Sequence, residues 1–118
     1  MTSREDSIRR LTTLAEEVLP LIKDNYLSFD NWKKGETACI LGHACQHHTF
    51  NKEGLTLLGL QTPKFKSLKC LDAKAGQVFF GLTEEEVVFL FAATSYAQPP
   101  TVQEAVDKVN RLIKVRQD

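Results

Sequence analysis

Apolar residues recur at helical intervals at both ends of the chain. Thr2 and Glu5 have the spacing of a capping box, which predicts that a helix begins there. Pro20 falls inside the apolar pattern and predicts a kink or break near residues 16–20, because proline removes a backbone hydrogen bond. Thr101 and Glu104 repeat the capping spacing before the last helix. The apolar positions are Ile8, Leu11, Leu14, Ala15, Val18 and Ile22 in the first helix, and Val102, Ala105, Val106, Val109, Leu112 and Ile113 in the last.

Two further helices are predicted between residues 72 and 96. Asp72 can cap the first, and Gly81 is suited to end it because glycine readily adopts left-handed backbone angles. Thr83 and Glu86 form another capping box, which begins the second. Every position in 87–93 is apolar, so we expect this helix to lie in the middle of the domain and to run to about Tyr96.

The remaining segments carry turn-forming residues. Residues 25–35 predict a loop that contains Trp32, the only tryptophan. We expect Trp32 to anchor this loop over the core, because large aromatic side chains are mostly used for burial, and a ligand-stacking platform is the less favoured alternative. Residues 55–68 predict a small hairpin that turns at Gln61-Thr62-Pro63. The predicted fold is therefore all-α, with about five helices and at most one short β-hairpin around residues 55–68.

Length and composition indicate one globular domain over residues 1–118. Apolar residues make up 42% and charged residues 25% of the chain, as is usual for a folded protein in water. The longest apolar run, 87–93, is far shorter than the roughly 20 residues that span a bilayer, so we expect no membrane segment. Three cysteines form no even set, which favours reduced thiols and a cytoplasmic protein.

Positive charge is concentrated in the middle of the chain. Residues 33–74 hold seven lysines and three acidic side chains, a net charge of +4, while the whole chain has a formal net charge of zero. A duplex-binding domain typically carries a more clustered basic patch with arginines for base edges, and this segment has no arginine. Nucleic acid is therefore the less favoured partner, and another protein is the favoured one.

Residues 36–51 contain most of the reactive side chains, and we interpret them as one buried helix. Cys39, His43 and His47 would then share one face at i, i+4 and i+8. Three ligands in that series extend roughly 12 Å along the axis and cannot all reach one ion. A zinc site would need one pair and a ligand from elsewhere, so we assign no metal and leave the question open for these three residues. Gly42, in the middle of the helix, indicates that another backbone passes close by.

Residues 36–51 could also contain a thiol nucleophile. Cys39 with His43 one turn later could place a base near the sulfur. We expect Cys39 to be buried among apolar neighbours, where thiolate is disfavoured, and no oxyanion hole is evident. We therefore assign no catalytic residue and no cofactor.

Several short motifs together resemble a known family. They are Trp32, Ala38-Cys39, Gly42-His43-Ala44, Phe50, Gly54-Leu55, residues 79–83 (Phe-Phe-Gly-Leu-Thr), Leu90-Phe91 and Tyr96. The pattern, with Ala-Cys-x-x-Gly-His-Ala at its centre, resembles a family of small uncharacterised helical domains from phages and bacteria. The likeness covers about residues 29–116. It implies no particular activity, cofactor or partner, but it draws attention to Cys39 and His43.

We therefore predict a small protein-binding or adaptor domain, in a phage or mobile-element setting, with Trp32, Cys39 and His43 as binding residues. The alternative is a small metal-dependent or thiol-dependent enzyme centred on Cys39 and His43. The sequence indicates neither the identity of the partner nor the oligomeric state.

Overall fold

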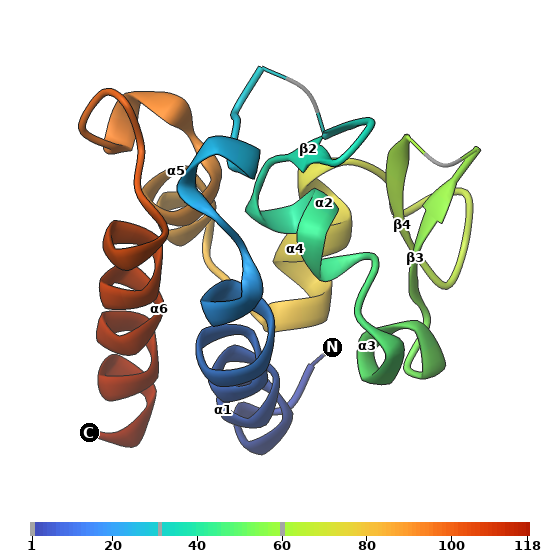
Figure 1. The fold of residues 1–118 in the computed structure, drawn as a ribbon. Coiled ribbons are helices and arrows are strands. Elements are labelled where there is room, and N and C mark those ends of the chain that lie inside the picture. The colour runs from blue at the N-terminus through green and yellow to red at the C-terminus, as the bar shows by residue number, and fades with distance from the viewer. Residues whose placement is uncertain (1, 31, 60) are drawn as a thin grey trace.

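The computed structural model describes residues 2–30, 32–59 and 61–118, and over these residues the chain is mainly helical with two short antiparallel hairpins (Figure 1). The α-helices are α1 (Arg4–Thr13), α2 (Ile40–Ala44), α3 (His48–Lys52), α4 (Ala73–Phe80), α5 (Glu84–Phe91) and α6 (Val102–Gln117). Shorter helical turns are η1 (Leu14–Val18), η2 (Leu19–Leu21), η3 (Asp24–Tyr26) and η4 (Ala93–Ser95). The strands are β1 (Lys33–Lys34), β2 (Thr37–Ala38), β3 (Leu55–Leu58) and β4 (Thr62–Phe65). None of the helices in these residues is long and apolar enough to cross a bilayer.

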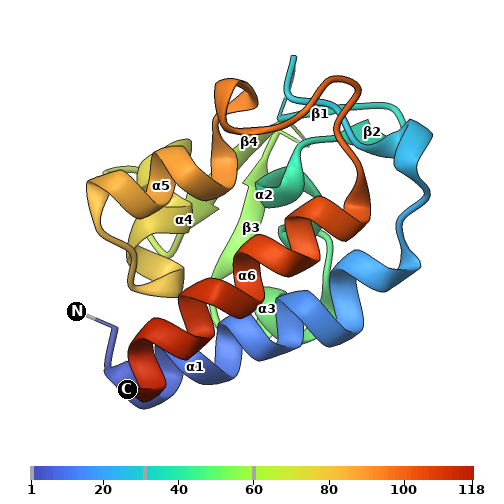
Figure 2. The same ribbon diagram turned by 90° about the vertical axis from the view of Figure 1, so that its left-hand side faces the viewer.

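Helices α1 and α6 pack side by side and antiparallel, so both termini lie at the same end of the molecule (Figure 2). Arg116 of α6 holds this end together. Its guanidinium donates to both carboxylate oxygens of Glu86, at 2.6 and 2.9 Å, to Ser7 Oγ at 2.8 Å and to the Gly81 carbonyl at 2.8 Å. Because one side chain contacts α1, α5 and the end of α4, the last helix is fastened to three other elements.

The first helix is capped one residue later than predicted and breaks where Pro20 predicted. The cap is Ser3, whose Oγ accepts from Asp6 N at 3.1 Å, and the prediction of Thr2 as the cap was wrong. The Thr2 hydroxyl instead donates to the carbonyl of Val78. The break predicted near residues 16–20 is confirmed, because η1 is a π-helical turn and η2 a 3₁₀ turn that contains Pro20.

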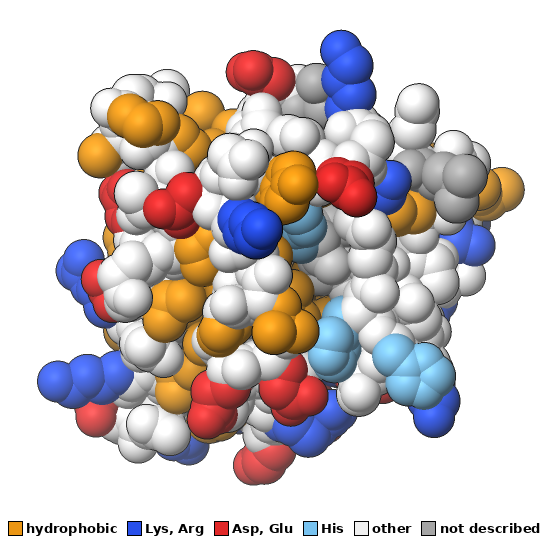
Figure 3. Space-filling view, in the orientation of Figure 1, with side chains coloured by type: hydrophobic (Ala, Val, Ile, Leu, Met, Phe, Trp, Pro, Cys, Tyr) orange, Lys and Arg blue, Asp and Glu red, His pale blue; other side chains and the backbone are white. Residues whose placement is uncertain are grey.

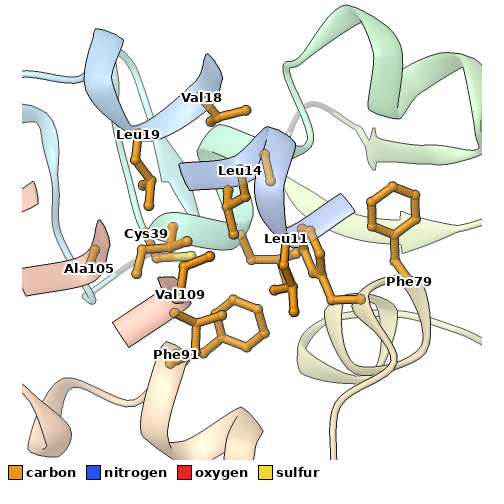
Figure 4. Packing of buried hydrophobic residues seen from close by; sticks show 14 of the residues in the cluster. Leu11, Leu14, Val18, Leu19, Cys39, Phe79, Phe91, Ala105 and Val109 are labelled. Atoms are coloured by element: carbon orange, nitrogen blue, oxygen red, sulfur yellow. The ribbon is translucent and has the colours of Figure 1, made fainter. Parts of the chain in front are cut away.

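The core is built around edge-to-face phenylalanine rings. Phe50 lies 4.9 Å from Phe79 and 5.6 Å from Phe80 between ring centroids, and all three side chains are fully buried. Arg10 covers this cluster, with its guanidinium carbon 4.2 Å from the Phe79 ring centroid and Nη1 donating to the Phe79 carbonyl at 2.8 Å. Glu53 accepts from the same arginine at 3.2 Å, so the buried charge is paired. Figure 4 shows the buried cluster around Leu11 and Leu14.

Residues 36–51 do not form one helix, contrary to the prediction. Strands β1 and β2 pair as a hairpin (Lys33↔Ala38, Lys34↔Thr37) around Gly35, whose φ is +62°. Helix α2 then covers only five residues, and α3 begins after a break. Asn51 stabilises this break, because its Nδ2 donates to the carbonyls of Cys45 at 2.7 Å and Leu55 at 2.8 Å.

The hairpin predicted at residues 55–68 is confirmed as β3 and β4, in which Leu55 pairs with Phe65. Alternation places Pro63 and Phe65 of β4 inward and Lys64 outward. With the β1–β2 hairpin there are two hairpins in the described chain, so the all-α description with at most one hairpin is only approximate.

Helices α4 and α5 confirm two of the predicted signals and correct two others. Gly81 ends α4 in the left-handed conformation, and Thr83 with Glu86 forms the capping box of α5. Asp72 precedes α4 at φ 57°, and its side chain makes no capping bond. Helix α5 is not central and ends at Phe91, before Tyr96. Leu90 is fully buried, whereas Val88 is 55% exposed.

Candidate functional site

A pocket of about 360 Å³ lies between the loop before β1 and the end of α5. Its lining residues are Phe29, Asp30, Trp32, Cys39 and Phe91. Two of the three predicted binding residues, Trp32 and Cys39, therefore meet at one pocket, whereas His43 is not among its lining residues. A larger cavity, of about 440 Å³, lies at the end of α4 and contains none of the predicted site residues.

Local backbone bonds place the loop residues of this pocket. Ser28 N donates to the Ala38 carbonyl at 3.0 Å, and Leu27 bridges to Ala38, so the loop runs beside β2. The Ser28 hydroxyl accepts from Asp30 N at 3.2 Å, which closes a turn around Phe29. The Phe29 ring lies 4.6 Å from the Tyr96 ring, and Tyr96 is buried. The loop is thus fixed to the core on the N-terminal side of Asp30.

Cys39 acts as the cap of α2. Its sulfur accepts from Gly42 N at 3.4 Å, and its thiol points to the Trp32 carbonyl at 3.9 Å. The side chain is only 3% exposed, and Figure 4 shows it within the buried cluster. Burial raises the pKa of the Cys39 thiol to about 11, despite the backbone N–H of Gly42. The sulfur is therefore a thiol at neutral pH and a weak nucleophile.

Gly42 is the closest point between α2 and the loop. A β-carbon on this glycine would lie 1.7 Å from the Trp32 carbonyl oxygen. The prediction that another backbone passes close to Gly42 is confirmed, and that backbone belongs to Trp32. The glycine thus allows the tryptophan, and with it one wall of the pocket, to lie against the helix.

His43 ties α2 to η3. Its Nε2 lies 2.8 Å from the Tyr26 carbonyl, so a neutral ring donates its Nε2 proton there. Burial lowers the pKa of His43, and the carbonyls of Tyr26 and Ala38 offset only part of that effect. The neutral, hydrogen-bonded ring has a positioning role in the loop.

The helix face that Cys39, His43 and His47 were expected to share does not form. His47 lies in the break, as the cap residue of α3, with Nε2 3.8 Å from Glu17 Oε1. Within residues 2–30, 32–59 and 61–118, no group of three His, Cys, Asp or Glu side chains is arranged to hold a metal ion. The chain's three cysteines are free, and burial raises the pKa of Cys45 to about 12.

A second, smaller hollow lies beside the pocket. It measures about 140 Å³ and shares Phe29 and Asp30 with the first. Its other lining residues are Leu27, Ser28, Ala93, Gln98 and Pro100. We call the two hollows together the loop groove. Sequence reasoning did not single out Asp30 or Phe91 for this groove, although the run Phe29-Asp30 close to Trp32 could have signalled an acidic residue between aromatic ones.

No family model matches this chain, and comparisons with curated proteins and with solved structures found no match.

Proposed function

We propose that this chain is a small protein-binding domain that recognises a segment of a partner protein at the loop groove. The observation that carries the proposal is that Trp32 and Cys39 line one pocket together with Phe29 and Phe91. Aromatic side chains, tryptophan above all, provide much of the binding energy at protein interfaces, where they bury large area with few rotatable bonds. Two neighbouring hollows that share Phe29 and Asp30 suit a short segment of a partner.

The surroundings of the groove support binding more than catalysis. The loop is fastened by Ser28, His43 and the Phe29–Tyr96 ring contact, so its shape exists before a partner arrives. A preformed site loses little conformational freedom on binding. Figure 3 shows acidic and basic side chains interspersed over one face of the molecule, which does not favour a polyanion as the partner there.

The alternative, a thiol-dependent or metal-dependent enzyme centred on Cys39 and His43, is less well supported. A thiol with a pKa of about 11 is a poor nucleophile at neutral pH. His43 Nε2 is engaged by the Tyr26 carbonyl.

We also propose a setting for this protein. The resemblance to phage and bacterial domains suggests a mobile-element setting. Free cysteines fit the reducing cytoplasm, so we propose an adaptor that acts there.

Selection from a displayed library of random peptides tests this function directly. The immobilised chain should enrich peptides that share a motif. Their addition to ¹⁵N-labelled protein should shift amide signals of residues 27–39 and 89–98. Trp32→Ala should weaken peptide binding by about tenfold or more, as expected for a central aromatic contact. Leu21→Ala is the control, because this side chain is 85% exposed and lies outside the groove, and it should change binding less than twofold. Failure to enrich any motif, or shifts confined to other surfaces, would disprove the proposal.

A further inference from the structure

The loop groove contains one charged side chain among its described lining residues, the carboxylate of Asp30. Asp30 is exposed and lines both hollows. Within the described chain this carboxylate accepts no hydrogen bond and makes no ion pair, in contrast to Glu53 and Glu86, which pair with arginines. The groove therefore presents a negative charge beside aromatic walls.

Two lysines beside residues of this groove are already engaged. Lys33, which follows Trp32 in sequence, donates its Nζ proton to the Gly35 carbonyl at 2.7 Å. Lys108 of α6 places its Nζ 4.7 Å from the Tyr96 ring centroid and 3.9 Å from that of Phe89. The Phe89 ring also has the Arg111 guanidinium carbon 5.3 Å from its centroid, so the aromatic residues beside Phe29 already accommodate cations of α6, while Asp30 is left for a cation from outside.

We infer that the loop groove takes an arginine side chain of the partner segment, with the guanidinium against the aromatic walls and bonded to the Asp30 carboxylate. The inference rests on the proposed function and names the chemistry of its ligand. A guanidinium is planar and weakly hydrated, so it stacks on aromatic rings more readily than an ammonium does. It also donates two parallel hydrogen bonds to a carboxylate. A hollow of about 360 Å³ accommodates the head and stem of such a side chain.

Because Trp32 is the only tryptophan, its fluorescence reports on the groove alone. The probes are N-acetylarginine amide and its neutral isostere N-acetylcitrulline amide, titrated to about 50 mM at constant ionic strength, a range suited to the weak binding of a single side chain. We expect a saturable change in Trp32 emission with the arginine compound and none with the citrulline compound.

Matched variants separate the carboxylate from general charge effects. Asp30→Asn should weaken binding of the arginine probe by about fivefold or more, through loss of a charge-assisted contact. Glu16→Gln removes a carboxylate that is also exposed, from η1, and should leave the affinity unchanged within twofold. Equal responses to both probes, an unchanged affinity in Asp30→Asn, or equally tight binding of N-acetyllysine amide would overturn the arginine assignment.

The library peptides distinguish this inference from the proposed function. If they bind the groove and contain an arginine, replacement of that arginine by citrulline should weaken them by about tenfold, the loss of a bidentate ion pair against aromatic rings. If they bind the groove without an arginine, the protein-binding function stands and the arginine assignment fails. If no peptide binds, but the arginine probe does, the groove recognises a small guanidinium ligand and the protein-binding function fails.

Discussion

Gly42→Ala tests the contact that holds the loop against α2. An added β-carbon would lie 1.7 Å from the Trp32 carbonyl oxygen and 2.9 Å from the Ala38 β-carbon. Carbon and oxygen atoms that do not bond to each other rest at about 3.5 Å, so the two backbones must separate by nearly 2 Å. The obstacle is a backbone atom and cannot be relieved by a rotamer change. The loop must therefore move, and the wall of the pocket that contains Trp32 moves with it.

The expected cost follows from two opposing terms. Alanine is favoured over glycine inside a helix by about 1 kcal/mol, which alone would stabilise the variant. Overpacking typically costs about 1 to 3 kcal/mol and more where a backbone is displaced. We take about 4 kcal/mol for this clash, so the net loss is about 3 kcal/mol of an expected total stability of about 5 to 15 kcal/mol.

Urea unfolding measures this loss, and Trp32 fluorescence in the folded baseline reports the displacement of the loop. Gly59→Ala is the control, because its β-carbon would meet no atom of the described chain within 4 Å beyond its immediate chain neighbours. It should cost only about 1 kcal/mol, from the positive φ at that position. If Gly42→Ala were as stable as the natural chain, or more stable, with unchanged Trp32 emission, the close approach of Trp32 to α2 would be refuted.

Three other predictions concern the core, the imidazole and a strained turn. Leu90→Ala and Phe91→Ala should each lower the free energy of unfolding, measured in urea, by about 2 to 5 kcal/mol. Val88→Ala, on the exposed side of α5, should change it by less than about 0.5 kcal/mol. A loss below about 1 kcal/mol at both buried positions would contradict the packing. Burial lowers the pKa of His43 below its ordinary 6.5, so the unfolded chain binds a proton at this imidazole more tightly than the folded chain does. Stability should therefore fall as the pH drops from about 6.5 towards the lower pKa of the folded state. His43→Gln should remove that part of the slope and a chelator should not shift the melting curve, whereas chelator sensitivity lost in His43→Ala would indicate a metal site. Asp72→Gly should stabilise the fold by about 1 kcal/mol, because Asp72 has φ 57°, which is strained for a side-chain-bearing residue, and its side chain provides no cap. An unchanged or lower urea midpoint would show that the turn is unstrained.

Local signals in the sequence were sufficient for several elements. Gly81 ends α4, and the capping box of Thr83 and Glu86 begins α5. Both boundaries could be predicted because a cap depends on residues within one turn of each other. Pro20 likewise acts on its own turn. The 55–68 hairpin was found because its turn residues separate two apolar runs. Where only a few neighbouring residues decide the conformation, sequence reading was reliable.

Helical spacing misled where a turn and a side-chain hydrogen bond to the backbone interrupt the helix. Residues 36–51 have a helical apolar pattern, yet the segment is divided, because Asn51 bonds the Cys45 carbonyl and the backbone at Gly35 turns β1 into β2. The burial of α5 was overestimated for a related reason. An apolar run such as 87–93 does not show which of its sides meets the core, and Val88 is largely exposed.

The candidate site shows the same division between local and distant information. Gly42 indicated a close backbone, but that this backbone is Trp32 follows only from the path of the loop across α2. Phe91 reaches the pocket from α5, more than 50 residues after Cys39 in sequence, and no pattern within either segment connects them. Asp30 gains its importance from that meeting, since an exposed aspartate in a loop is ordinary until an aromatic residue from elsewhere lines the same pocket. The chemistry that we assign to the loop groove therefore depends on tertiary contacts, and Gly42→Ala, which changes one of them, should reduce arginine binding even though Asp30, Phe29 and Phe91 are all retained.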